Sequence, residues 1–338
     1  MNKLAGKKQR LRALLSGLLQ RVRSPSGRLV GTAAAGIVGF VLLFLAAHRF
    51  AEVAWPLSRG DPRLLVAAGG LSLLGYALKA YGWRQLFTAV ERPSPLALVA
   101  ANGGASVTAL ALPGRFDDIV RIAIARRFRG CHACVRTLCL SLFMLGLVDS
   151  AALAPLAFAA AVLPGHALGE RLGLSLLAAA GLAAAAVVIT LPRIVSSRRV
   201  LRTRLGRWLR PRTTPFRSAL HAWVLVSAFW LTRAVGLVVL LGALGVGFSF
   251  TLALVFLCAT SAAAALPVGP GGTATQAAAG SAVLIASGVG VSDAFAAAVA
   301  VQALGIVVGG SILVFATAWS MGSRLLPRNH PAPALVAG

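Results

Sequence analysis

A group of residues that could bind an anion lies at a break in an apolar stretch, directly after Pro113-Gly114. The cluster contains Arg115, Asp117, Asp118 and Arg121. Guanidinium groups bind phosphate in a bidentate manner, and the carboxylates could orient them or meet a cationic headgroup. We therefore predict a lipid-headgroup site here. A basic juxtamembrane helix that attracts anionic lipid without selecting it is the alternative.

A second break contains Pro270, Gly271 and Gly272 and is followed by Gln276. Proline and glycine interrupt helices, so we expect a new helix to begin near Thr273. The first turn of a helix presents unpaired backbone N–H groups, which favour an anion. The break is therefore a second candidate headgroup site, unless its small residues serve helix packing alone.

Two further charged residues, Asp149 and Arg233, fall in the middle of apolar segments. A charge at the bilayer centre costs about 2.5–3.5 kcal/mol on the insertion scale, so both side chains should face the protein interior. We predict that they pair with each other or share a polar cavity. The pair could be structural, fixing how two helices meet, or linked to transport.

The composition defines the class of protein. Of the 338 residues, 58% are hydrophobic and 12% charged, which is typical of a polytopic α-helical membrane protein. The net charge of +25 comes from 33 basic residues against 8 acidic ones, concentrated between apolar segments. This pattern indicates cytoplasmic loops on anionic lipid rather than a nucleic-acid interface.

The elements that must position these residues follow from hydropathy and charge. We expect a cytoplasmic cationic interfacial segment, a membrane domain and a short cytoplasmic tail, over residues 1–28, 29–320 and 321–338. Both termini are then cytoplasmic at the inner membrane, and basic loops 1–28 and 193–217 contact anionic headgroups. About six full spans are predicted, at 29–47, 64–87, 135–163, 172–191, 218–241 and 294–320.

Two regions each contain a pair of shorter apolar segments that do not fit as ordinary spans. The loops on both sides of residues 96–128 are predicted to be cytoplasmic, which predicts a re-entrant hairpin. For residues 248–290, charge permits either full spans or a hairpin. The similar stretches Ala111–Gly114 and Ala265–Val268 favour two broken-helix hairpins of opposite entry, the pattern of an inverted repeat.

Sequences around both breaks resemble the transmembrane, flippase-like domain of lysylphosphatidylglycerol synthases, in a stand-alone form without the aminoacyl-transferase domain. The stretch from Pro113 to Arg121 is similar to a Pro-x-Arg-x-Gly-Glu-x-x-Arg motif, and the stretch from Pro267 to Ala277 to a Pro-Thr-Pro-Gly-Gly-x-Gly-x-x-Glu motif. Asp117 and Asp118 replace Gly and Glu, Ala277 replaces the final Glu, and Gln302 stands where many members carry Arg.

The resemblance implies translocation of a phospholipid or polyprenyl-phosphate-type lipid between leaflets. Two alternatives stay open: a membrane-embedded lipid-headgroup transferase, and a non-catalytic scaffold or accessory subunit with an unknown partner. No catalytic, cofactor or metal site is expected, because nucleotide-binding and zinc-protease signatures are missing and the Cys131-x-x-Cys134 pair lacks further ligands. An enzyme is therefore the less favoured reading.

Overall fold

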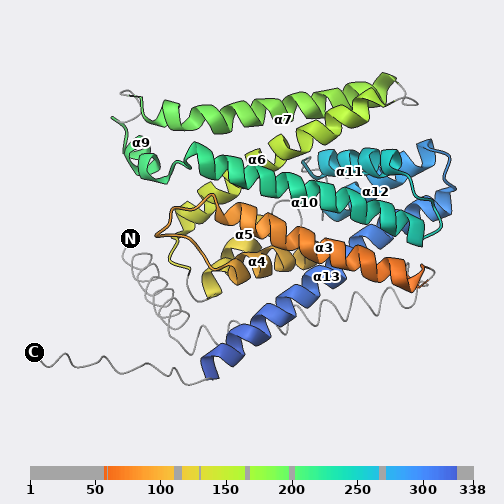
Figure 1. Ribbon diagram of the computed structural model, residues 1–338, viewed down its shortest axis with the longest axis horizontal. Helices are drawn as coiled ribbons and strands as arrows, with labels where there is room; N and C mark the ends of the chain where they lie inside the picture. Colours follow the sequence, from red (N-terminus) through yellow and green to blue (C-terminus); the bar gives the residue numbers. More distant parts are fainter. Residues whose placement is uncertain are drawn as a thin grey trace, which may run out of the picture.

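The computed structural model describes residues 57–58, 60–109, 116–128, 131–163, 168–197, 202–265 and 272–325. Within these ranges all regular secondary structure is helical, as predicted for a polytopic membrane protein (Figure 1). The elements are α3 (Pro62–Arg84), α4 (Pro95–Thr108), α5 (Phe116–Arg127), α6 (Val135–Val162), α7 (Leu168–Val195), α9 (Arg204–Leu209), the 3-10 helix η1 (Arg210–Arg212), α10 (Phe216–Ala243), α11 (Phe250–Ala265), α12 (Gly272–Ala286) and α13 (Val291–Leu325).

Local sequence explains where the first described helices begin. Asp61 caps α3 by accepting a hydrogen bond from the Arg63 backbone N–H, and Pro62 occupies the first turn. In the same way, the Ser94 hydroxyl accepts from the Ala97 N–H ahead of α4, which also starts with proline. Side-chain caps satisfy backbone donors that have no partner inside the helix, and proline lacks such a donor.

Five of the described helices are long and apolar enough to cross a bilayer: α3, α6, α7, α10 and α13. They correspond to five of the six predicted spans, with boundaries that differ by a few residues. The first predicted span, residues 29–47, lies outside the described residues, as do the segments 1–28 and 326–338.

Four shorter helices form two hairpins, α4 with the charged helix α5, and α11 with α12. Their lengths are 14, 12, 16 and 15 residues, or about 18–24 Å at 1.5 Å per residue. This is less than the roughly 30 Å hydrocarbon core. The hairpin predicted at residues 96–128 is therefore confirmed, and residues 248–290 form a second one; the turns at 110–115 and 266–271 lie outside the described residues.

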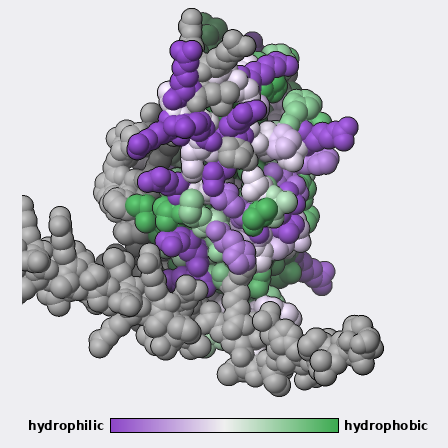
Figure 2. Space-filling model, turned by 90° about the vertical axis from the view of Figure 1, so that its left-hand side faces the viewer, coloured by the Kyte–Doolittle hydropathy of each residue, from purple (hydrophilic) through white to green (hydrophobic). Residues whose placement is uncertain are grey.

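The two hairpins enter from opposite ends of the helix bundle (Figure 1). The Asp61 N–H donates to the Ala243 carbonyl at 3.1 Å, so α3 begins where α10 ends, and the α11–α12 hairpin follows from there. At the other end, Arg212 contacts Glu91 at 3.2 Å, which joins the turn before α4 to the segment before α10. Hydrophilic side chains gather on this second end (Figure 2).

An approximate twofold axis relates two halves of the chain with an offset of 154 residues. A Cβ added at Gly82 of α3 would lie 3.4 Å from the Ala222 carbonyl oxygen, and one at Gly236 of α10 would lie 4.0 Å from the Ala68 carbonyl oxygen. Each residue in the second contact is 154 positions from its counterpart in the first. The contacts pair early with late residues, so α3 and α10 are antiparallel, as an inverted repeat requires.

The twofold axis that exchanges α3 and α10 also relates the helix pairs that pack against them. α3 packs on α4 as α10 packs on α11, and α4 packs on α13 as α11 packs on α6. Among the described helices α7 has no counterpart related by the twofold axis, and it packs mainly on α6 at the edge of the bundle (Figure 1). The inverted repeat suggested by the two similar stretches is therefore visible in the packing.

Candidate functional site

A cavity of about 260 Å³ lies between the two halves, where both hairpins meet the long helices. Its walls come from α3, α4, α5, α10, α11, α12 and α13. Charged and amide side chains from six of these helices line it: Lys79, Asn102, Asp117, Arg121, Arg233, Gln276 and Gln302. The tertiary structure thus gathers residues that are spread over more than 200 positions of the sequence.

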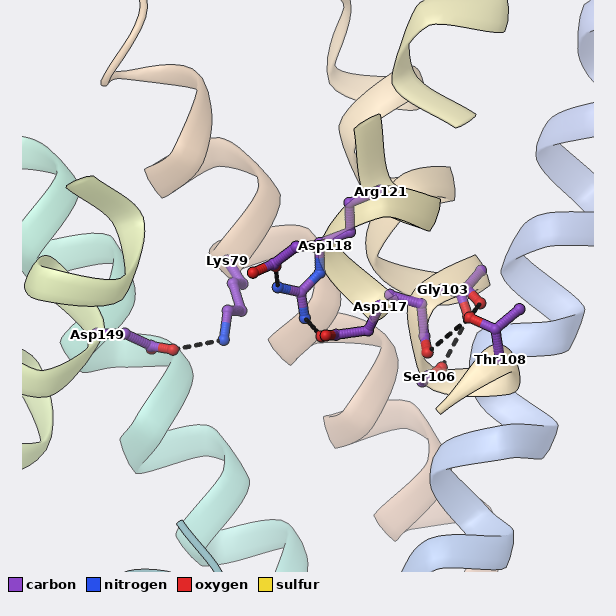
Figure 3. A network of polar contacts seen from close by, with 10 residues as sticks. Lys79, Gly103, Ser106, Thr108, Asp117, Asp118, Arg121 and Asp149 are labelled. Atoms are coloured by element: carbon purple, nitrogen blue, oxygen red, sulfur yellow. Dashed lines mark hydrogen bonds and ion pairs between the residues drawn. The ribbon is translucent and has the colours of Figure 1, made fainter. Parts of the chain in front are cut away.

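The first predicted cluster lies at one wall of this cavity. The Arg121 guanidinium contacts Asp118 Oδ1 at 2.9 Å and Asp117 Oδ2 at 3.2 Å, so it lies between two carboxylates (Figure 3). Asp117 and Asp118 occupy the first turn of α5, where negative charge complements the helix dipole. The charge of Arg121 is therefore offset locally, whereas Arg115 lies outside the described residues.

Asp149 has a different partner from the one predicted. Its Oδ2 lies 2.7 Å from Lys79 Nζ (Figure 3), and its Oδ1 accepts a hydrogen bond from Trp230 Nε1 at 2.9 Å. Lys79 is 15% exposed and reaches the bundle interior instead of extending to the α3 end. The predicted pairing with Arg233 is corrected, because α3 brings a cation of its own to this carboxylate.

Arg233 lies beside this pair and lines the cavity. Its guanidinium carbon is 5.7 Å from the centre of the Trp230 ring, a cation–π contact. Among the described residues Arg233 has no carboxylate partner, and its side chain is exposed. An exposed guanidinium with unused donors at a cavity wall can bind a phosphate group.

Asn102 is a cavity residue that the sequence did not single out. It is 4% exposed, and neither Oδ1 nor Nδ2 has a hydrogen-bond partner within the described part of the chain. An unmade hydrogen bond on a buried polar group costs about 1–3 kcal/mol. The available signal was an asparagine within an apolar helix, a position that requires a polar partner.

Close contact between α4 and α13 holds Asn102 at the cavity. A Cβ added to Gly103 would lie 2.6 Å from the Gly309 carbonyl oxygen, so glycine is required for this helix separation. Next to this contact, the Ser106 hydroxyl donates to the Gly103 carbonyl at 2.7 Å (Figure 3). Small residues at such crossings let membrane helices approach closely.

The second predicted cluster is described in part. α12 begins at Gly272, close to the expected start, and Gln276 in its first turns lines the cavity. Pro270 and Gly271 lie outside the described residues. Of the two breaks, therefore, the described residues that reach the cavity are Asp117, Arg121 and Gln276.

The Cys131-x-x-Cys134 pair lies away from the cavity, directly before α6. Both thiols are free. Cys134 is exposed, and its Sγ lies 3.3 Å from Thr137 Oγ1; this hydrogen bond lowers the pKa of the Cys134 thiol. Burial raises the pKa of Cys131 instead.

Comparison with known proteins agrees with this architecture. Searches of the curated proteins and of the solved structures found no significant match. The family model described as the lysylphosphatidylglycerol synthase TM region matches residues 28–312, which include both hairpins and every residue that lines the cavity. The chain is therefore a multi-pass membrane protein that belongs to the family of the lysylphosphatidylglycerol synthase TM region.

Proposed function

We propose that this protein moves a phospholipid or polyprenyl-phosphate-type lipid between membrane leaflets, with the headgroup phosphate bound at Arg233. The observation that carries the proposal is an exposed guanidinium, without a carboxylate partner among the described residues, at a cavity between two opposed hairpins. Family membership supports a function related to membrane lipids.

The charges around the cavity favour Arg233 as the first phosphate contact. Lys79 is engaged by Asp149 at 2.7 Å, and Arg121 by two carboxylates within 3.2 Å. An incoming phosphate must compete with those carboxylates, but at Arg233 it meets a cation that, within the described part of the chain, contacts the Trp230 ring and no carboxylate.

The size of the cavity and the symmetry of the fold favour movement of the headgroup past the protein. At about 260 Å³ the cavity is below the roughly 300–1,000 Å³ of sites that enclose drug-sized ligands, so a headgroup fits while the lipid tails stay in the bilayer. Inverted repeats with a midplane site support alternating access, because each half can adopt the conformation of the other.

The orientation follows from the positive-inside rule. We assign the end that carries Arg84, α9 and η1 to the cytoplasm of a plasma membrane, and we propose that both termini lie on the cytoplasmic side. The basic loops 1–28 and 193–217 then contact anionic lipid on the inner leaflet.

A proteoliposome assay tests this function. Purified protein is reconstituted with lipids labelled on the acyl chain, and exposure of the label to dithionite measures transfer between leaflets. Wild type should accelerate transfer of an anionic lipid, and Arg233→Gln should slow it about tenfold or more, since hydrogen bonds to charged groups contribute about 1.5–3 kcal/mol. Arg63→Gln, at an exposed arginine near the start of α3, is the matched control and should retain the rate.

Lack of acceleration by folded wild-type protein, with any lipid, would overturn the proposal. The two alternative functions, a lipid-headgroup transferase and a scaffold, would then be favoured.

A further inference from the structure

We propose that Asp149 is a proton-binding site whose protonation releases Lys79 to join Arg233 on a bound phosphate, so that a proton and an anionic lipid cross the membrane together. The inference rests on the anion site at Arg233 in the function proposed above, and it adds the proton as a second transported ligand. It is carried by a largely buried ion pair whose cation lines the same cavity as Arg233.

Trp230 holds the three charged groups together. Its Nε1 donates to Asp149 Oδ1 at 2.9 Å, and Lys79 Nζ and the guanidinium carbon of Arg233 lie 5.9 and 5.7 Å from the centre of its ring. Lys79 and Arg233 line the cavity, whereas Asp149 lies behind Lys79, outside the lining residues. The flexible lysine side chain can therefore turn from the carboxylate to a phosphate in the cavity without a shift of α3.

Stability alone does not account for an ion pair at this place. Lys79 and Asp149 are 15% and 23% exposed, and both belong to helices of spanning length. Apolar replacement of such a pair is often near neutral, so the fold does not require it. Ionisable residues inside membrane spans commonly belong to pathways for ions and protons.

The charges at the cavity are balanced before an anion binds. Three cations line its described walls, Lys79, Arg121 and Arg233, and three carboxylates contact two of them: Asp149 contacts Lys79, and Asp117 and Asp118 contact Arg121. A bound phosphodiester adds one negative charge, and uptake of one proton by a carboxylate restores the balance. The anion and the proton therefore favour the binding of each other, and this coupling is reciprocal.

Asp149 is the favoured proton acceptor among these carboxylates. Asp117 and Asp118 lie in the first turn of α5, where the helix dipole stabilises their charged form, and they are 28% and 41% exposed. Asp149 lies in the middle of α6, and its described partners are Lys79 and the neutral Trp230. When a phosphate attracts Lys79, the Asp149 carboxylate loses its cation and takes up a proton.

Water in the cavity can bring this proton once Lys79 has turned away. At about 260 Å³ the cavity has room for several water molecules. One O–H bond forms on the Asp149 carboxylate, and the same proton returns to water on the other side when the lipid leaves and Lys79 pairs again. One proton thus accompanies one phosphate monoanion, and no other reactant is consumed.

The other helices that pack on α6 and α3 add few ionisable groups. α4 contains none, and α11 contains only Cys258, which is buried. Besides Arg233, α10 carries Arg217 near its start and the exposed His221, which titrates near neutral pH and therefore needs a control. α7 and α13 carry their charged residues close to the helix ends: Glu170, Arg171, Arg193, Asp293 and Arg324.

Anion binding at different pH values tests the linkage in purified, detergent-solubilised protein. The probe is dimethyl phosphate, a phosphodiester that keeps one negative charge at every pH used. The rise of the melting temperature with probe concentration gives the affinity. Wild type should bind about tenfold more tightly at about pH 5 than at about pH 8, because protonation of Asp149 adds Lys79 as a second cation.

Asp149→Asn imitates the protonated carboxyl group. Its carbonyl oxygen can still accept from Trp230, while Lys79 is released. At about pH 8 this variant should bind dimethyl phosphate about tenfold more tightly than wild type, and its affinity should change less than about twofold with pH. A purely structural role of Asp149 would not produce a gain of affinity.

Further variants assign the proton to one residue. Lys79→Met/Asp149→Leu removes both charges of the pair and should bind weakly at every pH. Asp117→Asn and Asp118→Asn should keep the pH dependence of wild type. His221→Gln is the control for a second group that titrates in this range, and it should also keep the wild-type pH dependence.

A pH gradient tests whether the linkage drives transport. Proteoliposomes contain an anionic lipid with a short labelled acyl chain, and extraction into albumin measures its outer-leaflet fraction relative to protein-free vesicles. Wild type should concentrate the lipid in the leaflet that faces the alkaline side, because the proton moves down its gradient with the lipid. Lys79→Met/Asp149→Leu should give the same distribution with either orientation of the gradient.

The outcomes separate this inference from the proposed function. Wild-type affinity that is independent of pH, or Asp149→Asn that binds no more tightly than wild type at about pH 8, would overturn the linkage even if lipid is transferred. Loss of the pH dependence in Asp117→Asn, Asp118→Asn or His221→Gln would overturn the assignment to Asp149. Lipid transfer that ignores the gradient would overturn co-transport, whereas pH-linked binding without any transfer would overturn the proposed function and leave the linkage standing.

Discussion

Lys79 and Arg233 are each the eighteenth residue of their helices, α3 and α10, and both line the central cavity. The approximate twofold axis that exchanges these helices therefore exchanges the two cations. Their partners differ: Asp149 contacts Lys79 at 2.7 Å, whereas Arg233 packs on Trp230. One half of the repeat thus presents a neutralised cation, and the other half presents a cation available to a ligand.

Removal of Lys79 should destabilise the protein strongly. Lys79→Met leaves the Asp149 carboxylate in a site where it is 23% exposed, with Trp230 as its remaining hydrogen-bond donor among the described residues. Loss of one partner of a largely buried pair costs about 3–5 kcal/mol. The free energy of unfolding in mixed detergent micelles, followed by tryptophan fluorescence, measures this loss.

The double variant Lys79→Met/Asp149→Leu tests whether an unpaired charge causes the loss of stability, because it removes both charges of the pair. It should recover most of the stability, since apolar replacement of a buried pair is often near neutral. Arg233→Met should cost less than Lys79→Met. If Asp149→Leu instead rescued Arg233→Met and failed to rescue Lys79→Met, the assigned partner would be wrong.

The contact between α4 and α13 should not tolerate a methyl group at Gly103. Gly103→Ala would place a Cβ 2.6 Å from the Gly309 carbonyl oxygen, so the helices must separate. Overpacking of this kind costs about 1–3 kcal/mol. A fall in melting temperature checks the prediction, with Gly146→Ala as the control because nothing lies within 4 Å of its added Cβ. Equal melting temperatures for the two variants would contradict the close approach.

Cys134 should react faster than Cys131 with a soluble alkylating reagent. The Thr137 hydrogen bond lowers the pKa of Cys134, so its thiolate fraction is larger at any pH below the ordinary thiol pKa. Burial raises the pKa of Cys131 and has the opposite effect. Mass spectrometry of each cysteine over a pH series should place the Cys134 midpoint lower.

Thr137→Val tests the cause of this reactivity. It should shift the Cys134 midpoint upward and slow alkylation near neutral pH by about twofold to tenfold, the value of one hydrogen bond. Thr190→Val controls for general effects of losing a threonine hydroxyl. An unchanged midpoint in Thr137→Val would exclude this hydrogen bond as the cause.

Glu91 and Arg212 should be energetically coupled. Their carboxylate and guanidinium lie 3.2 Å apart and are 18% and 24% exposed. A double-mutant cycle of Glu91→Gln and Arg212→Gln should give a coupling energy of about 0.5–3 kcal/mol in unfolding measurements. The cycle of Glu91→Gln with Arg207→Gln, at an exposed arginine of α9, should give none. Equal coupling in both cycles would indicate a general charge effect.

The sequence by itself determined the class of the protein and most of its membrane elements. Apolar segments of spanning length predicted α3, α6, α7, α10 and α13, because a bilayer requires about 20 apolar residues for each crossing. Charge asymmetry identified the α4–α5 hairpin, since two consecutive inside loops exclude a single full span between them. These are local properties of the chain, and neighbouring helices do not alter them.

The tertiary structure decided which charges meet and where the cavity lies. Asp149 was recognisable as a buried acid, but the sequence suggested Arg233 as its partner, and the orientation of α3 in the bundle brings Lys79 to it instead. Asn102 became notable when the α4–α13 contact left its amide unpaired. Pairing across a fold depends on the orientation and separation of distant helices, and these follow from packing of the whole bundle rather than from any single segment.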